Sequence, residues 1–294
     1  IIDDTARLLT IKPLHDLPEH LCFDEFKSVK SSDSNMSFII CDSTTHKLVD
    51  VVRDRKSYSL KKYFHRFEPK TRLKVKTISI DMYLPYIQLI KEMFPNAKII
   101  IDPFHIVQAL NRELNRTRVR VMNKHRYKDP KLYRKLKHYW KLILKNPNEL
   151  QNYKYNRYKL FESFITSKGI VDYILENNPS LKNDYEVVHS LRECIQDRDY
   201  IEFKETIEAA TQLDLSPGLK RVLKTLITYL PYIQNTCEHP TRTNGPIEGI
   251  NNKIKVLKRN AYGFRNYYHF RNRIILITKM FGPKQKGIKQ QLVA

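Results

Sequence analysis

Short apolar segments rich in β-branched and aromatic residues recur through the first hundred residues, separated by polar connections. Because this pattern is typical of β-strands, it predicts five of them, at residues 21–26, 36–42, 47–53, 75–80 and 97–101. The first three are joined by short polar segments, which favours an antiparallel meander. Helical spacing at 57–67 and 83–94 predicts two helices, and the second places the last two strands in a right-handed crossover that makes them parallel.

The chain beyond residue 105 has amphipathic, helical patterns and lacks any convincing strand. Prolines interrupt these patterns and predict breaks at Pro130, Pro147, Pro179, Pro217, Pro231 and Pro240. A helix is then predicted from Pro246, at a first helical position, to about Arg259, and a last one over 266–281. The expected domains are a lead-in at 1–18, a first part of the core at 19–110, a helical insertion at 111–240 and closing helices at 241–294.

The composition is that of a globular protein. A chain of 294 residues with 41% hydrophobic content can bury a sizeable core, in one large domain or two smaller ones. No segment approaches the roughly 20 apolar residues that span a bilayer, and the N-terminus lacks a signal-peptide pattern, so we expect a cytoplasmic protein without membrane contact. The first residue is not Met, which suggests a fragment. The four separated cysteines favour neither a zinc site nor a disulfide framework, and we expect them to be reduced and mostly buried.

The net charge of +22 is concentrated in two segments. Residues 110–160 contain 16 basic and 3 acidic groups, and residues 249–294 contain 11 basic groups and no acidic one. Residues 161–240, by contrast, contain 8 basic and 13 acidic groups. Two basic segments of this kind attract a polyanion, and nucleic acid is the commonest polyanion in a cytoplasm. The alternative is a solvated basic surface kept for solubility.

Three acidic residues occupy positions from which a sheet edge or a helix start would present them to one crevice. Asp24 interrupts an apolar strand, Asp81 follows a buried strand at its carboxyl end, and Glu248 lies in the first turn of a predicted helix. Mg²⁺ prefers oxygen ligands such as carboxylates, and a few of them can hold two ions about 4 Å apart. Each acid also has a structural alternative: Asp24 in an ion pair with an arginine, Asp81 as a helix cap, and Glu248 as a partner of the helix dipole.

A fourth acid, Asp102, complicates the choice of the second ligand, because it ends the fifth strand just as Asp81 ends the fourth. Spacing alone does not decide between the two. His105, three residues after Asp102, is compatible with a catalytic assistant, a nucleic-acid contact or an ordinary core histidine.

Residues 75–112 and 244–275 resemble the ISL-three family of bacterial insertion-sequence transposases. The resemblance is carried by Asp81 followed by a helix, by Asp102-Pro103-Phe104-His105, and by Asn244-Gly245-Pro246-Ile247-Glu248-Gly249-Ile250-Asn251-Asn252. It implies an RNase H-like α/β fold, with a mixed five-stranded sheet and a long all-helical insertion before the last catalytic helix. Members of the family also carry zinc-binding and helix-turn-helix segments before the catalytic part, and neither pattern is visible in this sequence.

The same resemblance implies an enzyme that cleaves DNA and transfers its strands at a metal site of the Asp, Asp, Glu type. The catalytic and metal-binding acids would be Asp24, Asp81 and Glu248, holding two Mg²⁺ or Mn²⁺ ions, with Asp102 and His105 in supporting roles. The partners would be transposon ends and target DNA, bound by a homo-oligomer associated with the bacterial nucleoid. A catalytically inactive DNA-binding relative and an RNase H-like nuclease are the alternative functions.

The basic segments supply the expected DNA contacts, because cations position phosphates. In the first segment the expected contacts are Arg112, Arg116, Arg118, Arg120, Lys124 and Arg126. In the second they are Lys253, Lys255, Lys258, Arg259, Arg265 and Arg271. Four rings interleave with the first segment and are interpreted as core residues rather than as rings that stack on unpaired bases: Tyr127, Tyr133, Tyr139 and Trp140.

Overall fold

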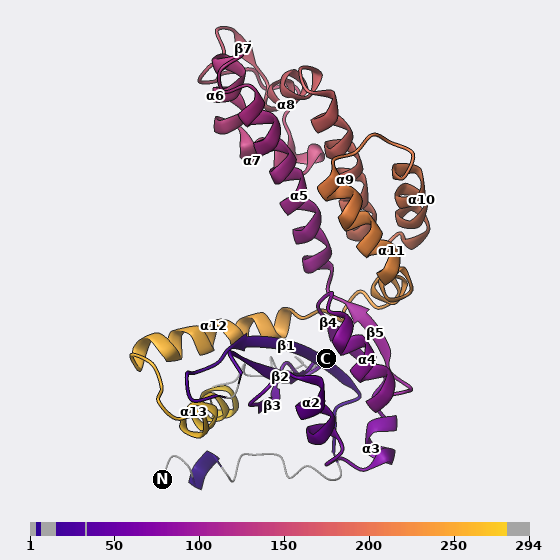
Figure 1. Ribbon diagram of the computed structural model, residues 1–294, viewed down its shortest axis with the longest axis vertical. Helices are drawn as coiled ribbons and strands as arrows, with labels where there is room; N and C mark the ends of the chain where they lie inside the picture. The colour runs from indigo at the N-terminus through magenta and orange to yellow at the C-terminus, as the bar shows by residue number, and fades with distance from the viewer. Residues whose placement is uncertain (1–3, 7–15, 33, 281–294) are drawn as a thin grey trace, which may run out of the picture. The chain divides into compact units, whose positions relative to one another are not determined.

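The computed structural model describes residues 4–6, 16–32 and 34–280, and the chain divides into two compact units. One unit comprises residues 1–102 and 241–294, and the other comprises residues 103–240. Figure 1 shows the helices and strands of each unit. Most of the predicted lead-in, residues 1–18, lies outside the described residues, and so does the last residue of the final predicted helix.

A five-stranded sheet with the order β3-β2-β1-β4-β5 forms the centre of the first unit (Figure 1). Adjacent strands pair antiparallel from β1 to β2 and from β2 to β3, whereas β4 runs parallel to both β1 and β5. The five strands and their directions confirm the prediction, and the mixed sheet is that of an RNase H-like α/β fold. The strands are β1 (His20–Lys27), β2 (Met36–Asp42), β3 (Leu48–Val52), β4 (Thr77–Ile80) and β5 (Lys98–Ile101).

Aromatic rings join one face of the sheet to the helices α2 (Ser57–Phe64) and α4 (Leu84–Met93). The ring centroid of Phe23 on β1 lies 5.5 Å from that of Phe64 on α2 and 6.2 Å from that of Phe94, which follows α4. All three rings are almost completely buried. Side chains alternate along a strand, so the residues on either side of Phe23 in the chain point to the opposite face of the sheet.

A short helix that the sequence pattern did not predict, α3 (Pro69–Leu73), precedes β4. The backbone N–H of Val75 donates to the carbonyl of Arg72 over 3.3 Å, and this bond continues the turn at the end of α3. For this reason β4 begins at Thr77, two residues later than predicted.

The opposite face of the sheet packs against α12 (Gly245–Asn260) and α13 (Tyr267–Met280) (Figure 1). Ile247, Ile250 and Ile254 recur at helical spacing along α12 and are buried in one cluster with Cys22 and Phe26 of β1. This packing connects two parts of the chain that are far apart in the sequence. It also fixes which side of α12 faces the sheet.

The second unit is built mainly from helices, and three of them meet at a buried carboxylate. Asp184, which is fully buried, accepts hydrogen bonds from the hydroxyl of Thr117 over 2.7 Å and from the backbone N–H of Ser216 over 2.9 Å. These bonds tie α5, α9 and α11 together. The helices of this unit are α5 (Pro103–Lys124), α6 (Pro130–His138), α7 (Trp140–Leu144), α8 (Ser167–Glu176), α9 (Pro179–Asp197), α10 (Tyr200–Ala210) and α11 (Pro217–Glu238), with a 3₁₀ turn η1 (Pro147–Glu149).

Two details of this unit differ from the sequence prediction. The segment 111–240 is not all-helical, because β6 (Asn156–Arg157) and β7 (Phe164–Ile165) form an antiparallel pair. Strands of two residues are too short to produce an alternating pattern, so no sequence signal indicated them. Pro231 lies inside α11 instead of ending a helix. None of the helices in the described part of the chain is long and apolar enough to span a membrane.

The packing of α12 on the sheet yields a stability prediction. Ile250→Ala removes a buried side chain from the α12 cluster and should lower the free energy of unfolding by about 2–5 kcal/mol, measured by urea denaturation. The control is Val256→Ala, at a position on the same helix that is 50% exposed, where a change within about 0.5 kcal/mol is expected. Equal losses for the two variants would contradict the packing described here.

Candidate metal centre

Three aspartates are arranged in one row: Asp24 on β1, and Asp81 and Asp102 directly after the ends of β4 and β5. Cys22 pairs with Ser79 in the parallel ladder between β1 and β4, so the row two residues further along contains Asp24 and Asp81. In the ladder between β4 and β5, Ile80 pairs with Ile101, and the backbone N–H of Asp102 continues the ladder by donating to the Ile80 carbonyl over 2.9 Å. Carboxylate oxygens of Asp81 and Asp102 lie within 4.8 Å of one another.

The row faces the side of the sheet that carries α12. Cys22 and Phe26 of β1 pack in the cluster with α12, and Asp24 lies between them at the same phase of the strand. Glu25 projects to the other side, where its carboxylate accepts hydrogen bonds from Arg55 over 2.6 Å and from the Tyr86 hydroxyl over 2.8 Å. Arg55 therefore forms an ion pair with Glu25 on this strand.

Two asparagines connect α12 to the aspartate row. The side-chain N–H₂ of Asn244, immediately before α12, donates to the Phe23 carbonyl over 3.1 Å and to Asp81 Oδ1 over 3.3 Å. The side-chain N–H₂ of Asn251, two turns into the helix, donates to Asp24 Oδ2 over 2.8 Å. Each asparagine thus bonds a different aspartate of the row, and both of them bond β1.

Glu248 lies between these two asparagines on the surface of the helix. It follows Asn244 by four residues and precedes Asn251 by three, and residues at these separations share one side of an α-helix. Because the two asparagines touch Asp81 and Asp24, the Glu248 side chain starts from the side of α12 that borders the aspartate row. The residue itself is exposed. A negative charge in the first turn also interacts favourably with the helix dipole. The structural alternative given for Glu248 is therefore compatible with a role in the site.

The donor set fits a divalent cation with a preference for oxygen. Asp24, Asp81, Asp102 and Glu248 offer carboxylate oxygens only, which is the chemistry that Mg²⁺ and Mn²⁺ select. In addition, the side-chain oxygens of Asn244 and Asn251 are buried and have no hydrogen-bond partner among the described residues. A buried, unpartnered amide oxygen is costly, and a hydrated cation in the carboxylate row would supply such oxygens with partners.

Cys22, on the same face, does not add a sulfur ligand to this set. Its thiol donates to the Thr243 carbonyl over 3.3 Å, and burial, with a contribution from the negative charge of Asp102, raises the pKa of the Cys22 thiol to about 12. The thiol is thus engaged with the chain itself, and sulfur is a poor match for the oxygen-preferring ions that the carboxylates fit. Cys41 and Cys194 are also buried and unbridged, and Cys237 is half-buried, which agrees with the expectation for the cysteines.

The other two residues of the sequence hypothesis differ in their surroundings. Asp102 is 7% exposed, whereas Asp81 is half-buried and bonded to Asn244. His105 lies in the first turn of α5 and belongs to the second unit. Sequence reasoning assigned no role to Asn244 and Asn251, although their separations from Glu248 were the signal that could have found them.

Four of the expected DNA contacts in the first basic segment form a stripe along α5. Arg112, Arg116, Arg120 and Lys124 recur every four residues, and all of them are exposed. Arg126 is exposed beyond the end of the helix. Arg118 differs: it is buried, its guanidinium donates to the Leu136 carbonyl over 2.9 Å, and burial lowers its pKa. We therefore reassign Arg118 from DNA contact to packing between α5 and α6.

The second basic segment requires a similar correction. Arg271 forms an ion pair with Asp50 and donates to the Val51 carbonyl over 3.0 Å, so it holds α13 against β3. Lys258 is half-buried and donates to the carbonyls of Lys27 and Ser28 over 3.0 Å each. The remaining four expected contacts of this segment are exposed: Lys253, Lys255, Arg259 and Arg265.

The rings of the first basic segment also divide into two kinds. Tyr139 is buried, as expected of a core residue, and Tyr133 is half-buried. Tyr127 and Trp140 are 85% and 41% exposed, so the core interpretation is wrong for these two. Each of these two rings has a basic residue next to it in the sequence, and such a charged neighbour favours a position at the surface.

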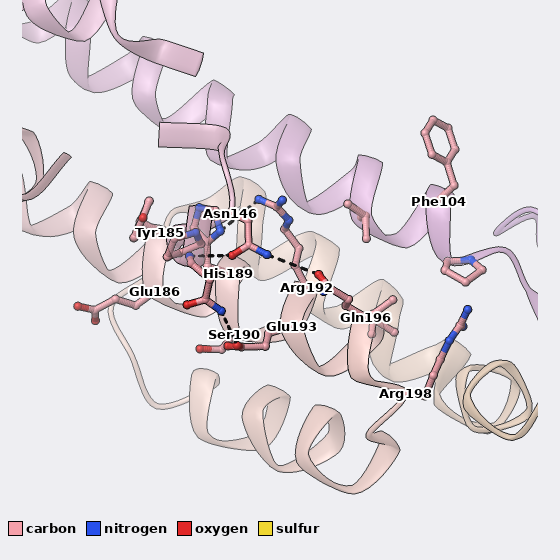
Figure 2. A pocket seen from close by; sticks show the side chains of 15 residues that line it. Phe104, Asn146, Tyr185, Glu186, His189, Ser190, Arg192, Glu193, Gln196 and Arg198 are labelled. Carbon is pink, nitrogen blue, oxygen red and sulfur yellow. Dashed lines mark hydrogen bonds between the residues drawn. The ribbon is translucent and has the colours of Figure 1, made fainter. Parts of the chain in front are cut away.

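A pocket of about 610 Å³ in the second unit, between the start of α5, η1 and α9, is a competing site (Figure 2). Its most buried titratable group is His189, whose ring bonds the Ile143 carbonyl over 3.0 Å and Arg192 over 3.1 Å. Burial lowers the pKa of His189 to about 4, so the ring is neutral at pH 7. Both ring nitrogens are used by the scaffold, and the geometry assigns His189 to packing.

Comparisons with known proteins found a matching family model and relatives with two different names. A family model described as a transposase matches residues 21–274 of this chain. The chain is 28% identical over 257 residues to the transposase for insertion sequence element IS1001 of Bordetella parapertussis, which covers 86% of this chain and 59% of that protein. It is 36% identical over 130 residues to a protein of Lactococcus lactis subsp. lactis named ATP-dependent protease, covering 44% of this chain and 40% of that protein. The chain thus spans less than two thirds of both relatives, and no solved structure matches it.

The contact between Asn251 and Asp24 predicts a loss of metal affinity when it is removed. Asn251→Ala should weaken Mn²⁺ binding by about 10–100-fold, measured by titration calorimetry, because partners that orient a ligating carboxylate contribute on this scale. Asn252→Ala changes the adjacent, exposed asparagine and should leave the affinity within about twofold of the unmodified protein. Similar affinities for both variants would show that Asn251 does not position a metal ligand.

Proposed function

We propose that this chain, which belongs to the ISL-three family of transposases, cleaves DNA and joins its strands by two-metal-ion chemistry. Asp24, Asp81 and Glu248 would be the catalytic carboxylates that hold the two Mg²⁺ or Mn²⁺ ions. The observation that carries the proposal is the pair of asparagines that connects the Glu248 helix to Asp81 and Asp24. The name of the Bordetella parapertussis relative, a transposase for an insertion sequence, agrees with it.

When bound, the ions would activate the attacking oxygen and stabilise the leaving oxygen of an in-line phosphodiester displacement. The residues of this chain supply the rest. Asn251 orients Asp24, and Asn244 fixes Asp81 to the carbonyl of Phe23 and so to the neighbouring strand. Glu248 is exposed on the side of α12 that borders the aspartate row, where it would add its charge and incoming DNA could reach it.

Asp102 and His105 would support the site without holding an ion on their own. A carboxylate oxygen of the buried Asp102 lies within 4.8 Å of one of Asp81, so Asp102 would add negative charge beside it. His105 follows it by three residues and would contact the substrate or share a proton with a neighbouring acid.

The DNA would be held by the exposed cations of both units through phosphate contacts. Transposon ends and target DNA are the proposed partners, and a homo-oligomer on DNA in the bacterial cytoplasm is the proposed working form. The proposed contacts are Arg112, Arg116, Arg120, Lys124, Arg126, Lys253, Lys255, Arg259 and Arg265, with Lys258 partly engaged by the backbone.

Glu248→Gln tests the proposal directly. The amide keeps the size of the side chain and removes a charge that helps to hold an ion, so Mg²⁺-dependent cleavage of labelled DNA should fall by about 100-fold or more. DNA binding should persist or tighten, because the variant has one negative charge fewer near the phosphate. Excess EDTA should abolish cleavage by the unmodified protein.

The matched control is Glu92→Gln on α4, which removes an exposed glutamate that pairs with Lys61 and should leave cleavage within about twofold. Cleavage by Glu248→Gln within a few-fold of the unmodified protein would remove Glu248 from the site. If the unmodified protein cleaves DNA without joining it to a 3′-hydroxyl, the nuclease alternative is favoured. If it binds DNA without cleaving it, the inactive DNA-binding relative is favoured.

A second pair of variants decides between the two strand ends. Asp81→Asn should leave less residual cleavage than Asp102→Asn, because Asp81 is half-buried and held by Asn244, while Asp102 lies deeper. Single-turnover rates with the same labelled DNA would measure the difference. The reverse order would show that Asp102 is the metal ligand.

A further inference from the structure

A second pocket of the helical unit has a composition suited to nucleic acid. It has a volume of about 430 Å³ and lies where α6 ends, α7 begins and the β6–β7 connection passes. Its lining consists of basic and aromatic side chains with one leucine: Arg134, Lys137, His138, Trp140, Lys159 and Leu160.

The charged side chains that line this pocket are all basic. The lining contains two lysines and an arginine but no carboxylate, whereas the pocket of Figure 2 contains Glu186 and Glu193 beside its arginines. Lys137 and Lys159 are exposed and form no ion pair within the described part of the chain. Cations gathered without acids around a concave surface raise the local concentration of an anion.

The walls of the pocket are held in place by a hydrogen bond and by cation–π contacts. The Tyr139 hydroxyl donates to the Lys159 carbonyl, which fixes the β6–β7 connection against the end of α6. The ammonium group of Lys135 lies 4.3 Å from the ring centroid of Phe161 and 4.1 Å from that of Tyr173, and so secures the same connection from its other side. Leu160 adopts a φ of 70°, which a leucine keeps only where its surroundings hold it.

Trp140 gives the pocket a second kind of contact. Its side chain is 41% exposed, although the adjacent Tyr139 is buried and indole rings usually contribute to cores. An exposed indole next to cations is a surface on which an unpaired base stacks, while the cations contact the phosphates on either side. Paired bases of a duplex present no free face for this contact.

We propose that this pocket binds a single-stranded segment of DNA, with one unpaired base stacked on Trp140 and its phosphates contacted by Lys137, Lys159 and Arg134. The proposal rests on the proposed function for DNA as the partner. It adds a site for an unpaired nucleotide, formed within the second unit and independent of the carboxylate row.

Trp140 is also the probe, because it is the one tryptophan of the 294 residues. Titration of the intact protein with a thymidine oligonucleotide at low salt should quench its fluorescence in a saturable manner. Replacing both Lys137 and Lys159 by Ala should weaken binding about tenfold or more and reduce the log-log salt slope by about 0.7 for each lysine that no longer neutralises a phosphate. Lys168→Ala, at an exposed lysine of α8, is the control and should leave both quantities unchanged.

A second measurement tests the stacking itself. Trp140→Ala should weaken binding of a fluorescein-labelled thymidine oligonucleotide by about tenfold, and Trp140→Phe should restore part of the affinity. Equal quenching by a blunt duplex or by inorganic tripolyphosphate would overturn the assignment to an unpaired base, and absence of quenching would overturn the site. If the unmodified protein shows quenching but no Mg²⁺-dependent cleavage, the proposed chemistry is refuted and the proposal for the pocket stands.

Discussion

The amide groups of Asn244 and Asn251 determine how the end of the chain meets its beginning. Each donates to a carboxylate on a different strand, and Asn244 also donates to the Phe23 carbonyl of β1. Apolar packing of the isoleucines of α12 holds the helix on the sheet, but such packing tolerates small shifts along the helix axis. The directional bonds of the two asparagines remove that freedom, so Glu248 acquires a defined position relative to Asp24 and Asp81.

The same contacts carry a cost in stability, which the proposed function of the site would explain. Both asparagines direct their N–H₂ groups at acids, which leaves their oxygens buried without partners among the described residues. The sheet also gathers three aspartates in adjacent positions, where like charges repel. A fold selected for stability alone would replace such groups by apolar ones. Local conflict of this kind, surrounded by an otherwise consistent core, is the usual mark of a binding or catalytic site.

Much of the first unit followed from the sequence, because its signals are local. Segments rich in β-branched and aromatic residues, separated by polar connections, predicted five strands, and β2 was predicted with its observed bounds. The side-chain contacts did not follow, since they depend on which residues fold together. Nothing near Arg118 in the sequence indicates that its guanidinium bonds the Leu136 carbonyl, and nothing near Arg271 indicates Asp50. Pro231 likewise lies inside α11, where tertiary packing outweighs its tendency to end a helix.

The distribution of charge explains why one chain would need two kinds of DNA contact. A row of carboxylates repels phosphates, and cations bound there would offset that repulsion, so DNA and metal would favour each other's binding at the aspartate row. The stripe on α5 and the pocket at Trp140 carry their own positive charge and need no ion. In the proposed function, the arginines and lysines would supply affinity, while the carboxylates would hold the ions that act on the phosphate. Because the two tasks require opposite charges, placing them on different elements lets each be strong without weakening the other.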